Sequence, residues 1–574
     1  MPRSTTTAAS ALTAAALVLG GITPITATAE AGNPFADHER QQLSWGPCAF
    51  PPGEDVRPAE CALVTVPRDW AAPGAGPDLA VSISRVVATG ERGGAVLVNP
   101  GGPGGQGTSL AGVLAALRPA LNERYDIIGM DPRGTGQEGG TAPEQRGLVC
   151  SVPTGRLSTR TDLDARDRSA DSVTEHLKAP RAIAEACQGQ ALTPYITTWQ
   201  TAHDVELVRR LLGESSLNYL GYSYGTWLGA KYASLFPDAA GKVVLDSSVD
   251  WQGRLQAAFE AFPAINQRHV DQVFLPWASR QFPDLLGGSG AEAKRVWERV
   301  RAFYDARGLL APDTYDAVFV GMGSEIRWAL AALLLVLGAA ELEGTAPGIA
   351  NPRLRERLDA ASLARFGVPV AGLTAATAAA ATRAEDYTAV GGTRFAVACG
   401  DQPTRSASWY RRLSDRQGPR YPLFGWAYGL SEPCGHWSDA PRQTLPTLPA
   451  SVSGRVLVVQ AEFDPQTGYE QARSALRAAP GVTAVLVDDS PFHGQYALGG
   501  NPCVDGVVEV FLLANSRPGD IVCPGVPLPG EDEVHPVAGP VGRGTAAATA
   551  QQQAEPPSRL RELARERIAA LNSP

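Results

Sequence analysis

The stretch GYSYG at residues 221–225 places Ser223 between two glycines, in the G-x-S-x-G pattern of a catalytic serine. The chain holds 61 glycines in 574 residues. At that frequency the pattern arises by chance about once in a few such chains, so its context matters. The apolar run LNYLGYS leads into the serine, and TWLGAKYASLFP, which has helical character, follows it. A sharp strand-to-helix turn of this kind exposes the hydroxyl of a nucleophile.

A serine hydroxyl is a weak nucleophile near neutral pH, so it needs a base, and the base needs an orienting acid. Asp464 follows the apolar run RVLVVQAEF, and His493 follows the run VTAVLVDD. The chain order is therefore serine, acid, histidine, which suits this motif. We predict a catalytic triad of Ser223, Asp464 and His493. Asp246, at the end of the run KVVLD, is the competing acid.

The glycine-rich segment PGGPGGQG at 100–107 follows another apolar run, AVLVN. Its glycines let the backbone approach a substrate, and we predict an oxyanion hole formed by the N–H groups of Gly102 and Tyr224. Pro103 has no N–H and cannot contribute. Prolines interrupt the G-x-G-x-x-G pattern of a dinucleotide loop, and no G-K-[ST] follows as in a phosphate loop. We therefore expect no cofactor.

The elements that would position these residues are continuous Val, Leu and Ile runs separated by helical stretches. This pattern is typical of a parallel sheet covered on both faces, and so of an α/β domain. The segment 251–395 reads as helical, with no strand, and is expected to cap the carboxyl edge of the sheet. The expected divisions are a core at 30–250 and 396–529, this cap, and a low-complexity linker with a terminal helix at 530–574. The predicted strands lie within residues 95–99, 125–131, 217–223, 242–248, 455–464 and 482–489.

Residues 1–29 have the layout of a secretory signal peptide: one arginine, a short apolar run and a small-x-small cleavage site after Ala29, with Ala31 as a second candidate. The apolar run at 328–340 is too short to cross a bilayer and predicts a core helix. We therefore expect a secreted protein without a stable membrane anchor. The net charge of -9 and pI near 5.5 argue against nucleic acid as a partner.

The eight cysteines also favour export, because an even number in an oxidising compartment indicates disulfides. None lies in a C-x-x-C pair, so a metal site is not expected. Although eight cysteines allow 105 connectivities, they fall into four couples along the chain. We predict nearest-neighbour pairing: Cys48–Cys61, Cys150–Cys187, Cys399–Cys434 and Cys503–Cys523.

The motifs NPGGPGGQG, DPRGTG, GYSYGT, LDSSVD, EFDPQT and FHGQ together resemble the α/β-hydrolase peptidases related to prolyl aminopeptidase. Within that group the likeness is to the secreted tripeptidyl aminopeptidases of Streptomyces and their mycobacterial relatives, and it spans roughly residues 40–525. The resemblance implies the α/β-hydrolase fold with a mostly parallel sheet and a helical cap insertion. It also implies Ser223, Asp464 and His493 as the triad and release of short peptides from free N-termini. Pro100 stands where prolyl aminopeptidases carry histidine, which argues against single-residue proline release.

An aminopeptidase must recognise the α-ammonium group of its substrate, which requires a carboxylate in a desolvated pocket. Glu260, Glu325, Asp401 and Glu432 are candidates, and the sequence does not choose among them. Two other functions stay open: a carboxylesterase or lipase on the same scaffold, and an inactive hydrolase fold that only binds. The expected partners are peptides with a free N-terminus.

Overall fold

The computed structural model describes residues 35–51, 53, 55–142, 145–344, 387–514, 516–541 and 558–571. The predicted signal peptide at 1–29 lies outside the described residues. So does the Ala-rich stretch at 355–385, which the sequence predicts to be helical.

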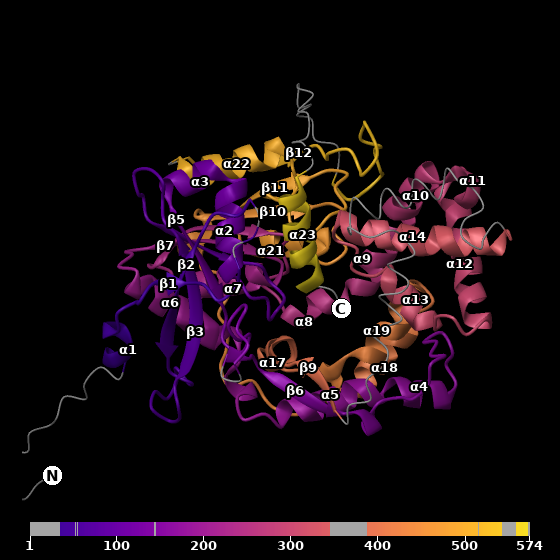
Figure 1. The fold of residues 1–574 in the computed structure, drawn as a ribbon, viewed down its shortest axis with the longest axis horizontal. Helices are drawn as coiled ribbons and strands as arrows, with labels where there is room; N and C mark the ends of the chain where they lie inside the picture. Colours follow the sequence, from indigo (N-terminus) through magenta and orange to yellow (C-terminus); the bar gives the residue numbers. More distant parts are fainter. Residues whose placement is uncertain are drawn as a thin grey trace, which may run out of the picture.

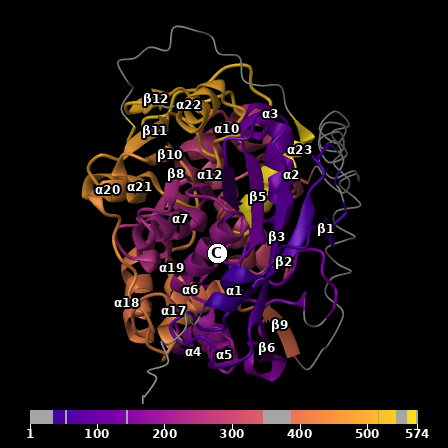
Figure 2. The same ribbon diagram turned by 90° about the vertical axis from the view of Figure 1, so that its left-hand side faces the viewer.

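A central sheet runs through the molecule, and Figure 2 shows it from the side of its antiparallel edge. Its order is β1-β2-β3-β5-β4-β7-β8-β10-β11-β12. Neighbours from β5 to β12 are parallel, whereas β1, β2 and β3 pair antiparallel with one another and with β5. The mostly parallel sheet is thus confirmed. The strands are β1 (Gly46–Pro47), β2 (Glu60–Val66), β3 (Leu79–Val86), β4 (Ala95–Asn99), β5 (Asp126–Asp131), β7 (Leu217–Tyr222), β8 (Ala240–Asp246), β10 (Val456–Ala461), β11 (Thr483–Val487) and β12 (Ile521–Cys523).

The parallel strands are apolar throughout because both of their faces are covered. In β4, Ala95 and Leu97 point into one hydrophobic cluster while Val96 and Val98 point into the other. This is the two-residue alternation of a strand with two buried faces. Five of the six predicted runs contain one of these strands and the sixth, 242–248, overlaps β8, which begins at Ala240, so the predictions are confirmed.

Helices cover each face of the sheet (Figure 1). One face packs against α6 (Thr198–Leu211), α7 (Tyr224–Leu235) and α21 (Tyr469–Ala478). The other packs against α2 (Thr108–Leu117), α3 (Pro119–Arg124), α22 (Pro502–Leu513) and the C-terminal helix α23 (Arg559–Leu571). Of two short helices, α20 (Ala450–Ser453) adds Val452 to the first of these clusters, whereas α1 (Ala36–Arg40) has no buried residue. Helices on both faces are what parallel strands require.

A helical unit with its own core lies beside the sheet, on the right in Figure 1. Trp277, Trp297 and Trp328 form the centre of that core. The predicted core helix at 328–340 is part of α14, and this prediction is confirmed. No helix of the described residues is both long and apolar enough to cross a membrane. The helices are α9 (Phe262–His269), α10 (Leu275–Gln281), α11 (Pro283–Leu286), α12 (Gly290–Ala306), α13 (Pro312–Val318) and α14 (Glu325–Leu342). The preceding helix α8 (Leu255–Glu260) packs into the core of the sheet instead.

A second group of elements, drawn at the bottom of Figure 1, joins the segment after β5 to the segment after residue 386. It contains a two-stranded sheet of β6 (Val149–Pro153) and β9 (Tyr387–Gly391), paired antiparallel. The expectation of an all-helical 251–395 is therefore wrong at β9. This strand is mostly exposed and its apolar residues do not alternate, so it can be recognised only from its pairing with β6. The helices of this group are α4 (Ala170–His176), α5 (Lys178–Gln188), α17 (Thr393–Gly400), α18 (Ala407–Gln417) and α19 (Gly425–Ser431).

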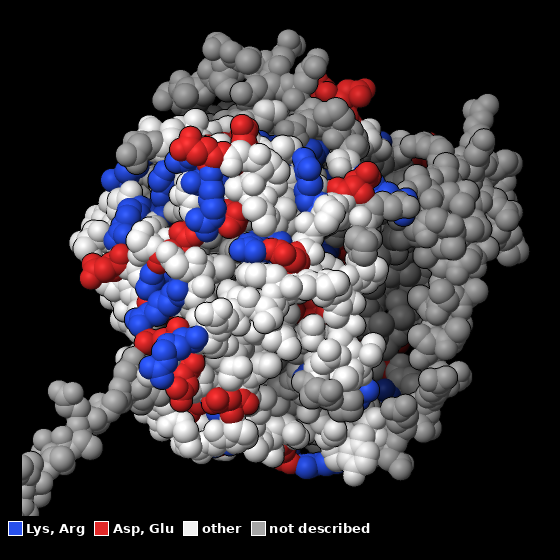
Figure 3. Space-filling view, turned by 60° about the vertical axis from the view of Figure 1, so that its left-hand side comes forward, with Lys and Arg blue, Asp and Glu red and all other residues white. Residues whose placement is uncertain are grey.

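Four disulfides join the eight cysteines as nearest neighbours: Cys48–Cys61, Cys150–Cys187, Cys399–Cys434 and Cys503–Cys523. Their Cα–Cα distances of 4.9 to 5.8 Å lie in the normal range for a disulfide. The predicted pairing is confirmed. On the face of the molecule shown in Figure 3, basic side chains lie beside acidic ones and do not form a field of one sign.

Candidate active site

Ser223 occupies the sharp turn between β7 and α7. Its backbone has φ 57° and ψ −122°, a conformation outside both strand and helix. The flanking glycines are required by space: a Cβ on Gly221 would lie 2.4 Å from the Gly225 carbonyl oxygen, and a Cβ on Gly225 would lie 2.8 Å from Asn99 Oδ1. The Ser223 N–H donates to the Asp246 carbonyl at 2.9 Å, which fixes the turn to the neighbouring strand. These are the features of a nucleophile elbow.

His493 and Asp464 are brought together by the loops that follow β11 and β10. His493 Nδ1 lies 2.8 Å and 3.0 Å from the two carboxylate oxygens of Asp464, and both side chains are fully buried. Asp464 also accepts hydrogen bonds from the Gln466 and Thr467 N–H groups. Burial alone would raise the pKa of Asp464, but His493 and these N–H groups hold it below the ordinary value. The carboxylate therefore stays ionised and orients the imidazole.

The other ring nitrogen of His493, Nε2, is buried and has no hydrogen-bond partner among the described residues. In this conformation it is thus not hydrogen-bonded to Ser223. Catalytic hydrogen bonds of this kind are often long until a substrate binds. We call the segment that follows β11 and carries His493 the histidine loop. It is also held by its backbone, because the His493 N–H donates to the Gly323 carbonyl at 2.9 Å.

Asp246, the competing acid, does not contact the imidazole ring through a hydrogen bond. Its buried carboxylate instead accepts the N–H groups of Gln495 at 3.1 Å and Tyr496 at 2.6 Å, immediately after His493. Burial raises the pKa of Asp246 to about 7, against the lowering effect of these N–H donors. Asp246 thus anchors the histidine loop, a role that the sequence did not suggest.

The glycine-rich segment forms the loop between β4 and α2. Gly102 has φ 114°, and a Cβ there would lie 2.7 Å from the Gly104 nitrogen, so only glycine fits. Asn99 accepts the Gly101 N–H at 2.9 Å at the start of the loop. Tyr224, the second predicted oxyanion donor, directly follows Ser223 in the first turn of α7. The loop that carries Gly102 starts at Asn99, whose side chain lies next to Gly225 of the elbow.

A carboxylate from the DPRGTG motif holds the end of this loop. Asp131 accepts the Gly107 N–H at 2.9 Å, the Thr108 N–H at 3.0 Å and the Glu138 N–H at 2.8 Å. Burial raises the pKa of Asp131 to about 6, against the effect of these donors. The sequence did not predict that Asp131 holds the glycine loop. The signal for it was an acidic residue at the carboxyl end of a strand.

Two of the four candidate ammonium-binding carboxylates are already engaged. Glu325 forms an ion pair with Arg565. Asp401 is buried and accepts the Thr198 N–H at 2.8 Å and the Trp227 indole N–H at 3.2 Å. Both carboxylates thus already have partners, although Glu325 Oε2 accepts no hydrogen bond among the described residues.

Burial raises the pKa of the other two, Glu260 and Glu432. The charge of Glu260 raises the pKa of Glu432 further, whereas Arg394 lowers it. Glu260 Oε1 lies 3.6 Å from Arg254 and accepts no hydrogen bond among the described residues. The two carboxylates therefore form an acidic group that these arginines neutralise in part.

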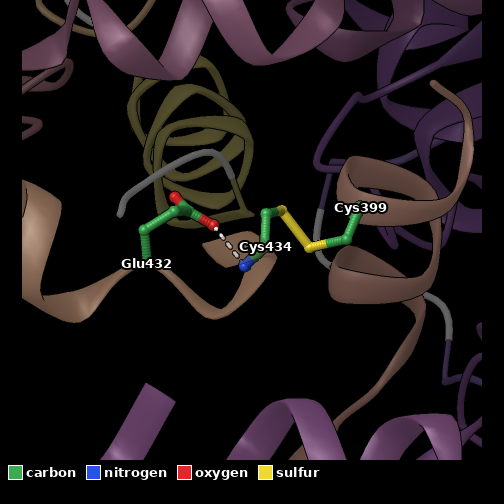
Figure 4. A group of neighbouring side chains, drawn as sticks. All are labelled: Cys399, Glu432 and Cys434. Atoms are coloured by element: carbon green, nitrogen blue, oxygen red, sulfur yellow. Dashed lines mark hydrogen bonds between the residues drawn. A yellow bond between two sulfur atoms is a disulfide. The ribbon is translucent and has the colours of Figure 1, made fainter. Parts of the chain in front are cut away.

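Glu432 also lies beside the sulfur atoms of Cys399 and Cys434, a set that resembles three metal ligands. Figure 4 shows that the two sulfurs are bonded to each other while Glu432 accepts the Cys434 N–H, at 3.1 Å. A disulfide does not supply the thiolates that a metal needs. A second acidic set consists of Glu462, Asp488 and Asp489. There Glu462 and Asp489 accept the N–H groups of Val541 and Val537, so these carboxylates hold the segment after β12.

Comparison with known proteins gives matches over most of the chain. Residues 94–313 match the family described as alpha/beta hydrolase fold, and residues 421–523 match the family described as TAP-like protein. A tripeptidyl aminopeptidase of Streptomyces coelicolor is 30% identical over 513 residues, covering 84% of this chain and 86% of that protein. A Mycobacterium tuberculosis protein named carboxylesterase B is 29% identical over 557 residues, covering 89% of this chain and 96% of that protein. Serine protease Hip1 of Mycobacterium tuberculosis is 32% identical over 247 residues, covering 42% of this chain and 45% of that protein.

Proposed function

Because the chain belongs to the α/β-hydrolase family that includes the tripeptidyl aminopeptidases, we propose that it is a serine peptidase. It removes short peptides, tripeptides in particular, from the free N-termini of peptides or proteins. One observation carries the reaction class: the buried hydrogen bond between His493 and Asp464, made beside the elbow that bears Ser223. This pairing prepares a histidine to act as a base toward a serine hydroxyl.

In the proposed mechanism the Ser223 hydroxyl attacks the scissile carbonyl and passes its proton to His493. The N–H groups of Gly102 and Tyr224 stabilise the oxyanion that forms. His493 then gives the proton to the leaving amine, which frees the remaining chain and leaves the released peptide as an acyl-enzyme on Ser223. Water, deprotonated by His493, hydrolyses that ester and regenerates the serine.

The neighbouring carboxylates of Glu260 and Glu432 support recognition of a free N-terminus. The charge of Glu260 raises the pKa of Glu432, so a further cation beside the two carboxylates would be favoured, and an α-ammonium group is such a cation. An apolar acyl chain would add to the desolvation of these carboxylates without adding a charge partner. The composition of this group therefore favours a peptide over a lipid.

Helix α17 connects the glycine loop with this acidic group. It begins against the loop, since a Cβ on Gly104 would lie 3.4 Å from Thr393 Cβ. It carries Cys399, whose disulfide leads to Cys434 and so to Glu432. The count of three residues rests on the similarity to the tripeptidyl aminopeptidases.

We propose a secreted protein, because the four disulfides would be stable in an oxidising compartment. The predicted cleavage after Ala29 is part of this proposal. We also propose that residues 251–395 act as the cap of the site, together with α17–α19.

Ester hydrolysis is the second candidate, favoured by the similarity to the protein named carboxylesterase B. The same triad would cleave esters as well as amides. A panel of chromogenic aminoacyl, dipeptidyl and tripeptidyl amides with short-chain acyl esters separates the two functions. We expect the highest kcat/KM for a tripeptidyl amide and no turnover by Ser223→Ala. Efficient hydrolysis of esters alone would instead support the esterase.

A further inference from the structure

The C-terminal helix α23 is packed into the body of the protein beside the candidate site. Figure 1 shows it between α2 and the cap helix α14, and it contacts both. Ala564, Ile568 and Ala569 on this helix are buried. A helix that only followed a linker would expose its charged face to solvent. This one directs Arg565 and Arg567 toward the loops that carry the predicted catalytic groups.

Arg565 of α23 contacts the histidine loop. This side chain is buried, and its guanidinium donates to the Leu498 carbonyl and pairs with Glu325 at the start of α14. It also stacks on the ring of Phe492, with 5.1 Å between the guanidinium carbon and the ring centroid. Phe492 directly precedes His493. Arg565 therefore connects the cap, the C-terminal helix and both sides of the histidine loop.

The segment that follows β10 and carries Asp464, the acid loop, binds a backbone carbonyl of the same helix. Gln466 Nε2 donates to the Ala569 carbonyl at 2.7 Å, and the Gln466 N–H donates to Asp464 Oδ1 at 2.8 Å. The side chain that α23 holds thus belongs to a residue that orients the Asp464 carboxylate.

The glycine loop contacts the end of the helix. Arg567 donates to the Gln106 carbonyl at 2.9 Å and pairs with Glu138 at 2.5 Å. A Cβ on Gly105 would lie 2.7 Å from Leu571 Cδ1, so the last turn of α23 lies directly on the loop. The loop that is predicted to supply the Gly102 N–H therefore has the helix as one of its walls.

We propose that α23 is a positioning element of the active site, and that Arg565 is the positioning residue for the loop that carries His493. The inference rests on the proposed function, because it takes His493 as the base. Three loops from three different strand ends touch one helix, so the helix fixes their relative placement. A displacement of about 1 Å in a catalytic group can cost about 10²-fold in rate. Arg565 touches no substrate and acts only through the loop.

The test must not leave a buried charge unpaired. Arg565→Met alone would strand Glu325, and a stranded charge destabilises the fold whatever the role of the arginine. The variant is therefore Arg565→Met combined with Glu325→Gln in the full-length protein. Arg559→Ala is the matched control, because Arg559 begins the same helix and is exposed.

Three quantities are measured: kcat and KM on a tripeptidyl amide, the rate of labelling by a serine-reactive fluorophosphonate, and the downfield proton resonance of the His493–Asp464 hydrogen bond. We expect the double variant to lose at least about tenfold in kcat and in labelling rate with KM within about threefold. The resonance should broaden or shift, whereas Arg559→Ala should match the parent. A helix that merely stabilised the fold would change the melting temperature and leave the resonance unaltered.

Parent-like kcat and labelling in the folded double variant would overturn the proposal. A rise in either would overturn it as well, because α23 would then obstruct the site. If the double variant does not fold, Arg565→Lys replaces it, since lysine keeps the pair with Glu325 but lacks the planar fork and stacking of arginine. Parent-like kcat in Arg565→Lys would count against the proposal and a selective loss of kcat would support it. A parent protein that neither reacts with the probe nor cleaves the tripeptidyl amide would refute the proposed function itself.

Discussion

Replacing Asp464 by asparagine separates the two acids that could serve His493. The asparagine side chain has nearly the shape of aspartate and fits the same buried space. It removes the charge that stabilises an imidazolium, and its amide can donate to Nδ1, which favours the tautomer with the proton on Nε2. In that tautomer His493 cannot accept the Ser223 proton. The same change in a serine protease lowers kcat about 10⁴-fold.

The geometry of the His493–Asp464 contact indicates how large the loss of kcat should be. Both carboxylate oxygens of Asp464 lie within 3.0 Å of His493 Nδ1, and no solvent reaches the pair. We therefore expect a loss of about 10³ to 10⁴ in kcat for Asp464→Asn, or roughly 4 to 5.5 kcal/mol in the activation free energy. KM should change little, because the substrate does not contact this group.

Asp246→Asn is the comparison. Its side chain accepts backbone N–H groups of the histidine loop, and one amide NH₂ would replace an acceptor there. An unsatisfied buried donor costs about 1–3 kcal/mol. We expect that cost to appear in urea unfolding, with a loss of kcat well below that of Asp464→Asn. Steady-state kinetics on a tripeptidyl p-nitroanilide and urea titrations measure both. A greater loss of kcat for Asp246→Asn would refute the assignment of Asp464.

Three further changes test other parts of the account. Glu432→Gln should raise KM for a free tripeptidyl amide at least about tenfold and leave the KM of an N-acetylated analogue unchanged, because only the charged terminus uses the carboxylate; equal effects on both substrates in steady-state assays would contradict this. Burial raises the pKa of Glu432, so on acidification its carboxylate is protonated at a higher pH than an ordinary glutamate and KM for the free substrate should rise there; a flat KM profile in the parent protein would argue against this ammonium site. Gly225→Ala should abolish activity and destabilise the elbow, since its Cβ would lie 2.8 Å from Asn99 Oδ1; near-parent kcat in a folded protein would show that the turn tolerates a side chain.

Local pattern was enough to predict six of the parallel strands and the contact between Asp464 and His493, but not β1, β2, β3 and β12. Buried parallel strands are continuous apolar runs, and the residues that follow them meet at one edge of the sheet, so Asp464 and His493 could be paired from their positions. The disulfides followed because each couple is near in sequence. These predictions needed no knowledge of distant contacts.

The features that the sequence did not predict depend on partners far away along the chain. Strand β9 forms only because β6 is available to pair with it. The sequence identified Glu325 and Glu432 as equal candidates, but Arg565 pairs with the first, whereas Glu260 and Arg394 both lie near the second. The terminal helix was predicted as a helix, yet its contacts with three catalytic loops require the folded arrangement.

The central claim is that Ser223 releases tripeptides from free N-termini. The most direct measurement is mass spectrometry of the products formed from one synthetic peptide of about ten residues, offered with a free and with an acetylated N-terminus. We predict that the parent protein releases the first three residues from the free peptide, that it leaves the acetylated peptide largely intact, and that Ser223→Ala releases nothing. Release of single residues, or equal cleavage of the acetylated peptide, would contradict the claim.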